Sequence, residues 1–388
     1  MNDETAAPAV TRPQFALTPK TLDEAMQFAK LLAGSSIVPK ALKKSNVRTA
    51  IDLFSGCGGL TQGLRDAGFT VGAAVEIDAL AAETYAANHP DVKLFNADIR
   101  HVSASQIMEA CAIEKGELDL LAGCPPCQGF SRIRLNNKRE RMDDPRNRLI
   151  DEVLRLISEM QPKVVMLENV PNLSRYTRYL NFKRDLRKLG YEVVDKVLDV
   201  ADFGVPQRRK RLVVLASRLG QIFHPDPVDG RRTVRDAIAK LPTDILKNDP
   251  LHNLGEQRSE RIRRLIKAIP KDGGSRTALS AGLILKCHEE QDGFYDVYGR
   301  MKWDDVSPTI TGGCINPSKG RFLHPTEDRA ITLREAAILQ SFPPDYVFSL
   351  RRGKYAAAEM IGNALPPLFS RTQAEVIKRH LVERSVAV

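Results

Sequence analysis

The sequence predicts an α/β fold in which an open, mostly parallel, Rossmann-like sheet of seven strands carries a smaller, irregular domain. Three observations support this prediction. Short apolar runs alternate with segments of helical periodicity over residues 48–216, as in doubly wound sheets. A glycine-rich turn follows the first run, and an acidic residue ends the second. Beyond residue 217 the alternation stops, and prolines interrupt the chain repeatedly until about residue 305.

The expected strands are short apolar runs bounded by turn residues. They cover residues 49–54, 70–75, 93–96, 118–122, 163–167, 191–198 and 211–216. Helical periodicity predicts helices over residues 21–32, 149–160, 181–189, 256–269 and 368–382, with a further helix opening at Leu60. The helix over 256–269 is basic, and its apolar residues share one face, so we expect that face to be used for packing.

This texture divides the chain into four parts. Residues 1–45 form an N-terminal extension, partly disordered, with one helix, and residues 46–218 form the main sheet domain. Residues 219–325 form the irregular domain, and residues 326–388 return to the sheet domain and end in its closing helix. A chain of 388 residues is long enough for this division.

Composition restricts the partners and the compartment. The chain has 58 Lys and Arg against 48 Asp and Glu, a net charge of +10, which suits a polyanionic partner but also occurs in proteins that bind none. Its six cysteines show no disulfide pattern, which favours a reducing compartment. No apolar run reaches the length of a membrane span, and the first residues are acidic. We therefore expect a cytoplasmic protein.

The first turn, Ser55 to Gly59, is expected to bind a nucleoside. Glycines allow a backbone to approach a ligand closely, and the following helix directs its amides at the same place. Glu76 ends the second strand about 20 residues further on, where dinucleotide-binding folds place the carboxylate that binds ribose hydroxyls.

A second turn, Gly123-Cys124-Pro125-Pro126-Cys127, follows the fourth expected strand. The two prolines fix the backbone just before Cys127, so this thiol is presented on a stiff bend. The pair Cys124 and Cys127 could also be a redox couple or half of a zinc site, although no second such pair exists. A structural, buried Cys127 is a further alternative.

Five blocks, in this order, resemble the cytosine-C5 DNA methyltransferases of bacterial or phage type. They are Asp52-Leu-Phe-Ser-Gly-Cys-Gly-Gly59, Pro125-Pro-Cys-Gln-Gly-Phe-Ser131, Glu168-Asn-Val170, Gln207-Arg-Arg-Lys-Arg211 and Gly362-Asn-Ala364. The resemblance runs from about residue 48 to 380 and leaves residues 1–45 and about 220–300 uncovered. It implies methyl transfer from S-adenosylmethionine, giving S-adenosylhomocysteine, to C5 of a flipped-out cytosine in duplex DNA. The uncovered stretch then corresponds to the target-recognition domain.

The resemblance also implies roles for individual residues. Cys127 is the nucleophile that adds to cytosine C6, Glu168 engages N3, and Arg211 holds O2, with Arg209 and Asn169 in support. The expected cofactor residues are Phe54, Gly56, Gly58, Gly59, Glu76, Ile77, Asp98, Ile99, Pro126, Leu149 and Asn363. The expected DNA contacts are Gln128, Ser131, Arg132, Arg139, Arg141, Thr309 and Thr311.

Two features of this assignment remain open at the level of sequence. The family often has an aromatic ring where this chain has Ile77, so stacking on adenine is in question here. No residue marks itself as the base that removes the C5 proton, and water could serve.

Other functions on the same fold have to be considered. A tRNA cytosine-C5 methyltransferase is one, although the Cys-Phe-Thr tripeptide typical of that branch is absent. A catalytically idle DNA-binding regulator is another, and the intact Cys127, Glu168, Arg211 and Asn363 argue against it. The expected enzyme is a monomer that needs no metal and contacts no membrane. Its recognition sequence, and whether a cognate restriction endonuclease acts separately on the same site, are left undetermined.

Overall fold

The computed structural model describes residues 47–126, 148–283 and 296–386. By the contacts between residues, the described ranges belong to one compact unit, Lys44–Val388. The helix expected over residues 21–32 lies outside the described residues, and the four-part division of the chain stays a prediction.

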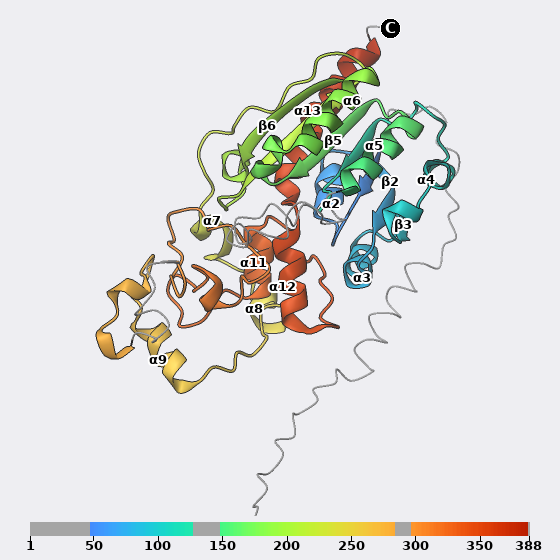
Figure 1. The fold of residues 1–388 in the computed structure, drawn as a ribbon. Coiled ribbons are helices and arrows are strands. Elements are labelled where there is room, and N and C mark those ends of the chain that lie inside the picture. Colours follow the sequence, from blue (N-terminus) through green and yellow to red (C-terminus); the bar gives the residue numbers. More distant parts are fainter. Residues whose placement is uncertain (1–46, 127–147, 284–295, 387–388) are drawn as a thin grey trace, which may run out of the picture. The chain divides into compact units, whose positions relative to one another are not determined.

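Seven strands form one sheet in the order β3-β2-β1-β4-β5-β7-β6. They are β1 Arg48–Leu53, β2 Phe69–Glu76, β3 Lys93–Asn96, β4 Leu120–Gly123, β5 Val164–Asn169, β6 Glu192–Asp199 and β7 Lys210–Ser217. Figure 1 labels four of them, β2, β3, β5 and β6. Only β7 is reversed, because it pairs antiparallel with both β5 and β6, while the other neighbours are parallel. The predicted mostly parallel sheet of seven strands is confirmed. Its order reverses between β1 and β4, where open α/β sheets bind their ligands.

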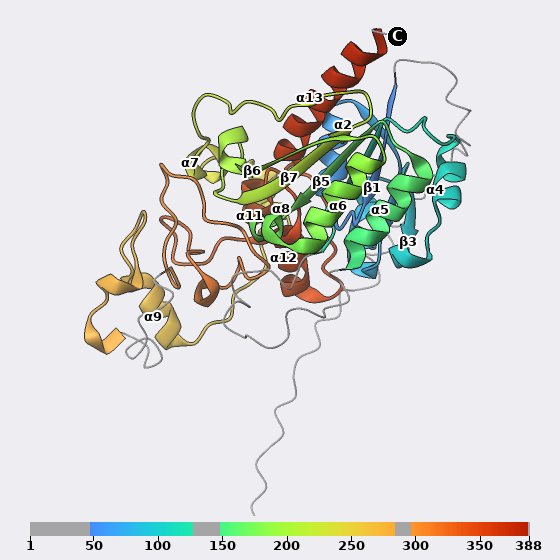
Figure 2. The same ribbon diagram turned by 45° about the horizontal axis from the view of Figure 1, so that its top comes forward.

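Helices cover both faces of the sheet (Figure 2). On one face lie α4 Ala104–Cys111, α5 Leu149–Met160 and α6 Thr177–Lys188, and on the other lie α2 Gly59–Asp66 and α13 Pro367–Val386. A further helix, α3 Ala79–Asn88, connects β2 to β3. Alternate residues of β5 contribute to the two cores: Val164 and Met166 to the α2–α13 side, Val165 and Leu167 to the other. This alternation explains why β5 reads as a continuous apolar run.

Between β7 and residue 332 the described residues form no strand longer than an isolated bridge. They contain the short helices α7 Val234–Ile238, α8 Thr243–Asn248 and α9 Glu260–Ala268. Two helices follow, α11 Leu333–Leu339 and α12 Gly353–Asn363, and they share a third core with α7. The regular alternation of strands and helices therefore stops after β7, as expected from the sequence.

The basic helix α9 packs through its apolar stripe, as expected. Leu265, Ile266 and Ile269 are buried in a small separate core, and Ile262 packs against it. The helix begins at Glu260 and not at the expected residue 256, because Ser259 caps it by accepting a hydrogen bond from the Ile262 amide at 3.4 Å.

The start of α6 was also misplaced by the sequence pattern. The helix begins at Thr177, four residues before the expected start. The added first turn contributes Tyr179, whose ring is buried against the sheet together with that of Phe182 in the next turn. Burial of Tyr179 explains the earlier start.

Candidate active site

The first turn packs closely against the rest of the protein. The Ser55 amide donates to the Val75 carbonyl at 3.0 Å, so the turn is attached to the end of β2. A Cβ on Gly58 would lie 2.5 Å from the Tyr346 hydroxyl, and one on Gly59 would lie 2.4 Å from the Leu365 carbonyl oxygen. These two glycines are therefore required by protein packing, a reason that the sequence analysis did not foresee.

Gly56 differs from them, because a Cβ there would meet open space. Its φ of 55° and that of Phe54, 58°, turn the chain sharply at the end of β1. The Gly56 amide donates to a carboxylate oxygen of Glu76 at 2.8 Å. Gly56 is thus the member of the turn that a ligand could approach.

Glu76 is held at both carboxylate oxygens. Besides the Gly56 amide, it accepts from the Asp78 amide at 2.8 Å, and burial raises the pKa of its carboxyl. The carboxylate therefore has one orientation before any ligand arrives. Ile77 follows it and is 65% exposed, so its side chain is available for apolar contact.

Asp98 and Ile99 lie in the loop after β3. The Asp98 carboxylate accepts from the Arg100 amide at 3.0 Å and forms an ion pair with the Arg100 guanidinium. That hydrogen-bonded guanidinium lowers the pKa of Asp98 to about 2, so the carboxylate is ionised at every physiological pH. The Ile99 side chain is buried.

This loop is held by Arg155, a residue of α5 that was not among the predicted site residues. Its guanidinium donates to the Ile99 carbonyl at 3.1 Å and to the Val102 carbonyl at 3.0 Å. The same helix begins at Leu149, another predicted cofactor residue, which is half-buried. The only signal in the sequence was the Glu152–Arg155 spacing, which also suits an ordinary surface ion pair.

Asn169 anchors the turn that leads to Cys127. Its side-chain amide donates to the Pro125 carbonyl at 2.9 Å and accepts from the Val170 amide at 2.8 Å. Pro126 follows in the same turn and is half-buried. Cys127 itself lies outside the described residues, as do Gln128, Ser131, Arg132, Arg139 and Arg141.

Cys124 has the properties of a structural cysteine. It packs against the core, and its amide donates to the Leu53 carbonyl at 3.2 Å. Burial, together with the nearby Glu168 carboxylate, raises the pKa of its thiol well above the ordinary value. A thiol with a raised pKa is a poor nucleophile at neutral pH.

Glu168 and Arg211, which the resemblance assigns to the same cytosine ring, form an ion pair. Glu168 lies near the end of β5, and the antiparallel pairing of β7 places Arg211 beside it, with Arg211 Nε 2.6 Å from the Glu168 carboxylate. Their side chains are only 10% and 15% exposed. This buried ion pair lies at the end of β5, next to the turn that Asn169 anchors.

Arg209 has different partners. Its Nη1 donates to the Ile310 carbonyl and to the Gly362 carbonyl, both at 2.9 Å. Burial, and then the neighbouring Arg211 charge, lower its pKa to about 9, so it stays protonated at neutral pH. Its guanidinium therefore connects two backbone segments.

The remaining predicted residues lie around these segments. Asn363 is the last residue of α12 and is exposed. The Thr309 hydroxyl donates to the Arg208 carbonyl at 2.7 Å, and the Thr311 hydroxyl accepts from the Gly313 amide at 3.4 Å. The Thr311 contact is local, whereas that of Thr309 reaches the segment before β7, and both threonines remain partly exposed.

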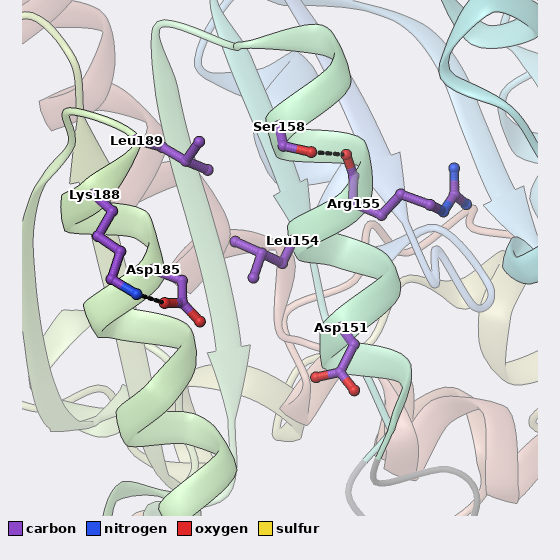
Figure 3. Close-up of a pocket in the computed structure, with 7 residues that line it drawn as sticks. All are labelled: Asp151, Leu154, Arg155, Ser158, Asp185, Lys188 and Leu189. Atoms are coloured by element: carbon purple, nitrogen blue, oxygen red, sulfur yellow. Dashed lines mark hydrogen bonds and ion pairs between the residues drawn. The ribbon is translucent and has the colours of Figure 1, made fainter.

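A groove of about 460 Å³ lies elsewhere, between α5 and α6 (Figure 3). Leu154 and Leu189 line it together with paired charges such as Asp185 and Lys188, which are 2.9 Å apart. None of the predicted site residues lines this groove. Among the described residues, no three His, Cys, Asp or Glu side chains are grouped as metal ligands, and no helix is long and apolar enough to cross a membrane.

The sheet is open with β7 reversed, a glycine turn follows β1, and fixed acids end β2 and follow β3. This arrangement indicates the class of Rossmann-like methyltransferases, and the solved structures agree. A prophage-encoded chain from E. coli, described as a DNA modification methyltransferase, matches with a TM-score of 0.63 and 25% identity over 86% of this chain and 99% of its own. The S. pombe Dnmt2 methyltransferase has the same fold, with a TM-score of 0.54 and 20% identity over 87% of this chain and 98% of its own.

The family model for C-5 cytosine-specific DNA methylases matches residues 48–379, and this chain belongs to that family. The Type II methylase M.HgiDII of Herpetosiphon aurantiacus is 37% identical over 86% of this chain and 96% of its own length. The Type II methyltransferase M1.HphI of Haemophilus parahaemolyticus is 35% identical over 85% of this chain and 86% of its own. The resemblance found in the sequence is confirmed.

Proposed function

We propose that this protein transfers a methyl group from S-adenosylmethionine to C5 of a cytosine in a specific site of duplex DNA. The observation that carries the proposal is the buried Glu168–Arg211 pair, with Arg211 Nε at 2.6 Å from the carboxylate, beside the Asn169-anchored turn that precedes Cys127. A carboxyl group and a guanidinium at this place can hydrogen-bond N3 and O2 of the same cytosine ring.

The residues at the carboxyl ends of β1, β2 and β3 suit the cofactor. Gly56 faces open space, the Glu76 carboxylate is oriented by two amides, and Asp98 is held ionised by Arg100. Fixed acceptors of this kind match ribose hydroxyls and an adenine amino group. S-adenosylmethionine supplies an electrophilic methyl group on a sulfonium. Phe54, Leu149, Pro126 and Asn363 would complete the pocket.

The protein's own part in the reaction begins with the Cys127 thiolate. It adds to C6, which forms an S–C6 bond and places electron density on C5 and N3. The Glu168 carboxyl group hydrogen-bonds N3, and Arg211 holds O2, so the developing charge is stabilised. C5 would then take the methyl group as the S–CH3 bond of the sulfonium breaks, with S-adenosylhomocysteine as the leaving group. Loss of the C5 proton to a base, with cleavage of the S–C6 bond, restores the aromatic ring and the thiolate.

The base must leave the duplex to reach Cys127, because C5 and C6 are not accessible to a nucleophile inside the stack. We infer that Gln128, Ser131 and the basic residues Arg132, Arg139 and Arg141 fill the gap and contact phosphates. The cationic side chains of the arginines suit contacts with phosphates, which contribute affinity and carry no sequence information.

The test is a covalent trap. Duplex DNA with 5-fluorocytosine at the target should remain attached to Cys127, because C5 then has no proton to lose. Cys127→Ser should abolish methyl transfer while cofactor binding persists, and Cys124→Ser serves as the matched control. Attachment at Cys124, or methylation of tRNA with none of duplex DNA, would contradict the proposal.

A further inference from the structure

Two buried glutamines take no part in the proposed chemistry. Gln207, just before β7, and Gln340, just after α11, are both fully buried. A buried amide without partners is costly, so the partners of these side chains indicate what they do.

Their hydrogen bonds form a directed chain. The Ile310 amide donates to Gln207 Oε1 at 2.9 Å, and Gln207 Nε2 donates to Gln340 Oε1 at 2.7 Å. Gln340 Nε2 donates in turn to the Ile361 carbonyl at 2.6 Å. An amide N–H at one end and a carbonyl at the other fix the orientation of both side-chain amides.

Arg209 extends this series of hydrogen bonds into a network. It donates to the carbonyls of Ile310 and Gly362, so both backbone groups of Ile310 are held, as are two successive carbonyls at the end of α12. The two segments are in close contact, because a Cβ on Gly362 would lie 2.1 Å from the Thr311 carbonyl carbon.

The segments held by this network contain proposed functional residues. Thr309 and Thr311 flank Ile310, and Asn363 follows Gly362. Arg211, the partner of Glu168, lies two residues beyond Arg209. The network therefore joins the segment expected to contact DNA, the cofactor end of α12 and the strand that carries the catalytic arginine.

We propose that Gln207 and Gln340 are positioning residues that hold Asn363 and the 309–311 segment in register with Arg211. The inference rests on the proposed function, because it assigns roles to these three places. Buried polar networks specify one arrangement more than they add net stability. In this one both glutamine amides are hydrogen-bonded, whereas Arg209 Nε has no partner among the described residues. The expected signature of breaking the network is thus a loss of catalytic efficiency in a protein that remains folded.

The first variant is Gln340→Met, which keeps the volume and removes all three hydrogen bonds of this side chain, those to Gln207, Ile361 and Ala364. We expect kcat/KM to fall by about 10- to 100-fold, the scale of a small misplacement of reacting groups, and the Kd of S-adenosylhomocysteine to rise. Gln373→Met is the matched control, because Gln373 is also fully buried but lies on α13. Its kcat/KM should match that of the wild type, and circular dichroism should show all three proteins folded.

The second variant, Gln340→Glu, gives a pH signature that a purely structural role would not. A protonated glutamic acid can donate to the Ile361 carbonyl and accept from Gln207, as glutamine does, whereas the carboxylate cannot donate. Burial raises the pKa of such a group. The ratio of its activity to that of the wild type should therefore be highest near pH 6 and fall as the pH rises, while the ratio for Gln340→Met stays flat.

Wild-type efficiency in Gln340→Met, a flat ratio for Gln340→Glu, or a failure of both variants to fold would overturn the inference. Failure to fold would assign the network to stability and not to positioning. A wild-type protein that binds the cofactor but methylates no duplex DNA would instead contradict the proposed function, and the change in cofactor Kd would still test the network.

Discussion

Glu76 illustrates how a single carboxylate can be prepared for a ligand. Both of its oxygens are hydrogen-bonded to backbone amides, at 2.8 Å each, and one of these amides belongs to the glycine turn. Glu76→Ala should weaken cofactor binding by about 1.5–3 kcal/mol, the scale of a charge-assisted hydrogen bond to ribose. Isothermal calorimetry with S-adenosylhomocysteine measures this. Glu83→Ala on α3, which removes an exposed partner of Arg351, is the control, and equal affinities in the two variants would reject the ribose contact.

The burial of the Asp52 carboxyl group should make the stability of the protein depend on pH. Asp52 is fully buried in β1, one oxygen accepts from the Thr61 hydroxyl at 2.7 Å, and the other has no partner among the described residues. Burial raises the pKa of its carboxyl to about 7. Between about pH 4 and pH 7 the folded protein therefore binds a proton that the unfolded chain has lost, so the free energy of unfolding falls as the pH rises through this window.

Asp52→Asn removes this proton linkage. The difference in unfolding free energy between Asp52→Asn and the wild type should increase by roughly 4 kcal/mol from pH 4 to pH 8, from about three pKa units. Urea unfolding at several pH values measures the difference. Asp66→Asn, at the exposed end of α2, should show no such trend, and parallel curves for Asp52→Asn and the wild type would contradict the assignment.

At the scale of elements, the region after β7 is organised by arginines as well as by apolar packing. Arg300 is fully buried and donates to the carbonyls of Ile266, Ile269 and His324 at 2.8, 3.0 and 3.0 Å. It also pairs with Asp328 at 2.6 Å. One side chain thus joins the end of α9 to the loop around residue 328.

Arg300→Met should therefore loosen this region and leave the sheet intact. Three buried carbonyls lose a donor, which we expect to cost about 3 kcal/mol. Hydrogen exchange should increase over residues 260–330, and cofactor binding should persist. The control is Arg264→Met, a residue 72% exposed and paired with Glu260, for which a change below about 0.5 kcal/mol is expected. Unchanged exchange in Arg300→Met would show that apolar packing alone holds α9.

At the scale of the whole molecule, specificity and chemistry should be separable. The proposed catalytic pair belongs to β5 and β7, whereas residues 225–305 contribute no strand to the sheet in the part that the structure describes. Replacing residues 225–305 with the matching region of a relative should change which site is methylated and leave the Cys127 chemistry unchanged. Bisulfite sequencing of methylated plasmid measures this outcome, and a chimera active on the original site would place recognition elsewhere.

The sequence by itself determined the sheet, the order of the motifs and the family, because these depend on local patterns. Apolar runs of strand length predicted all seven strands, and the acid at the end of β2 followed from its spacing to the glycines. A short apolar run suits a strand buried on both faces whichever strand it pairs with, so its own residues indicate the element. The resemblance assigned Glu168 and Arg211 to one cytosine ring, and the ion pair between them was added by the structure.

Only the tertiary structure decided which partners the other buried polar residues have. Gln340, Arg155 and Arg300 resemble ordinary polar residues in the sequence, yet each holds backbone carbonyls in a segment 21 to 56 residues away. The tertiary structure also revealed that Gly58 and Gly59 are required by packing against Tyr346 and Leu365. A buried donor must find an acceptor wherever the fold supplies one, and no local pattern specifies where that acceptor lies.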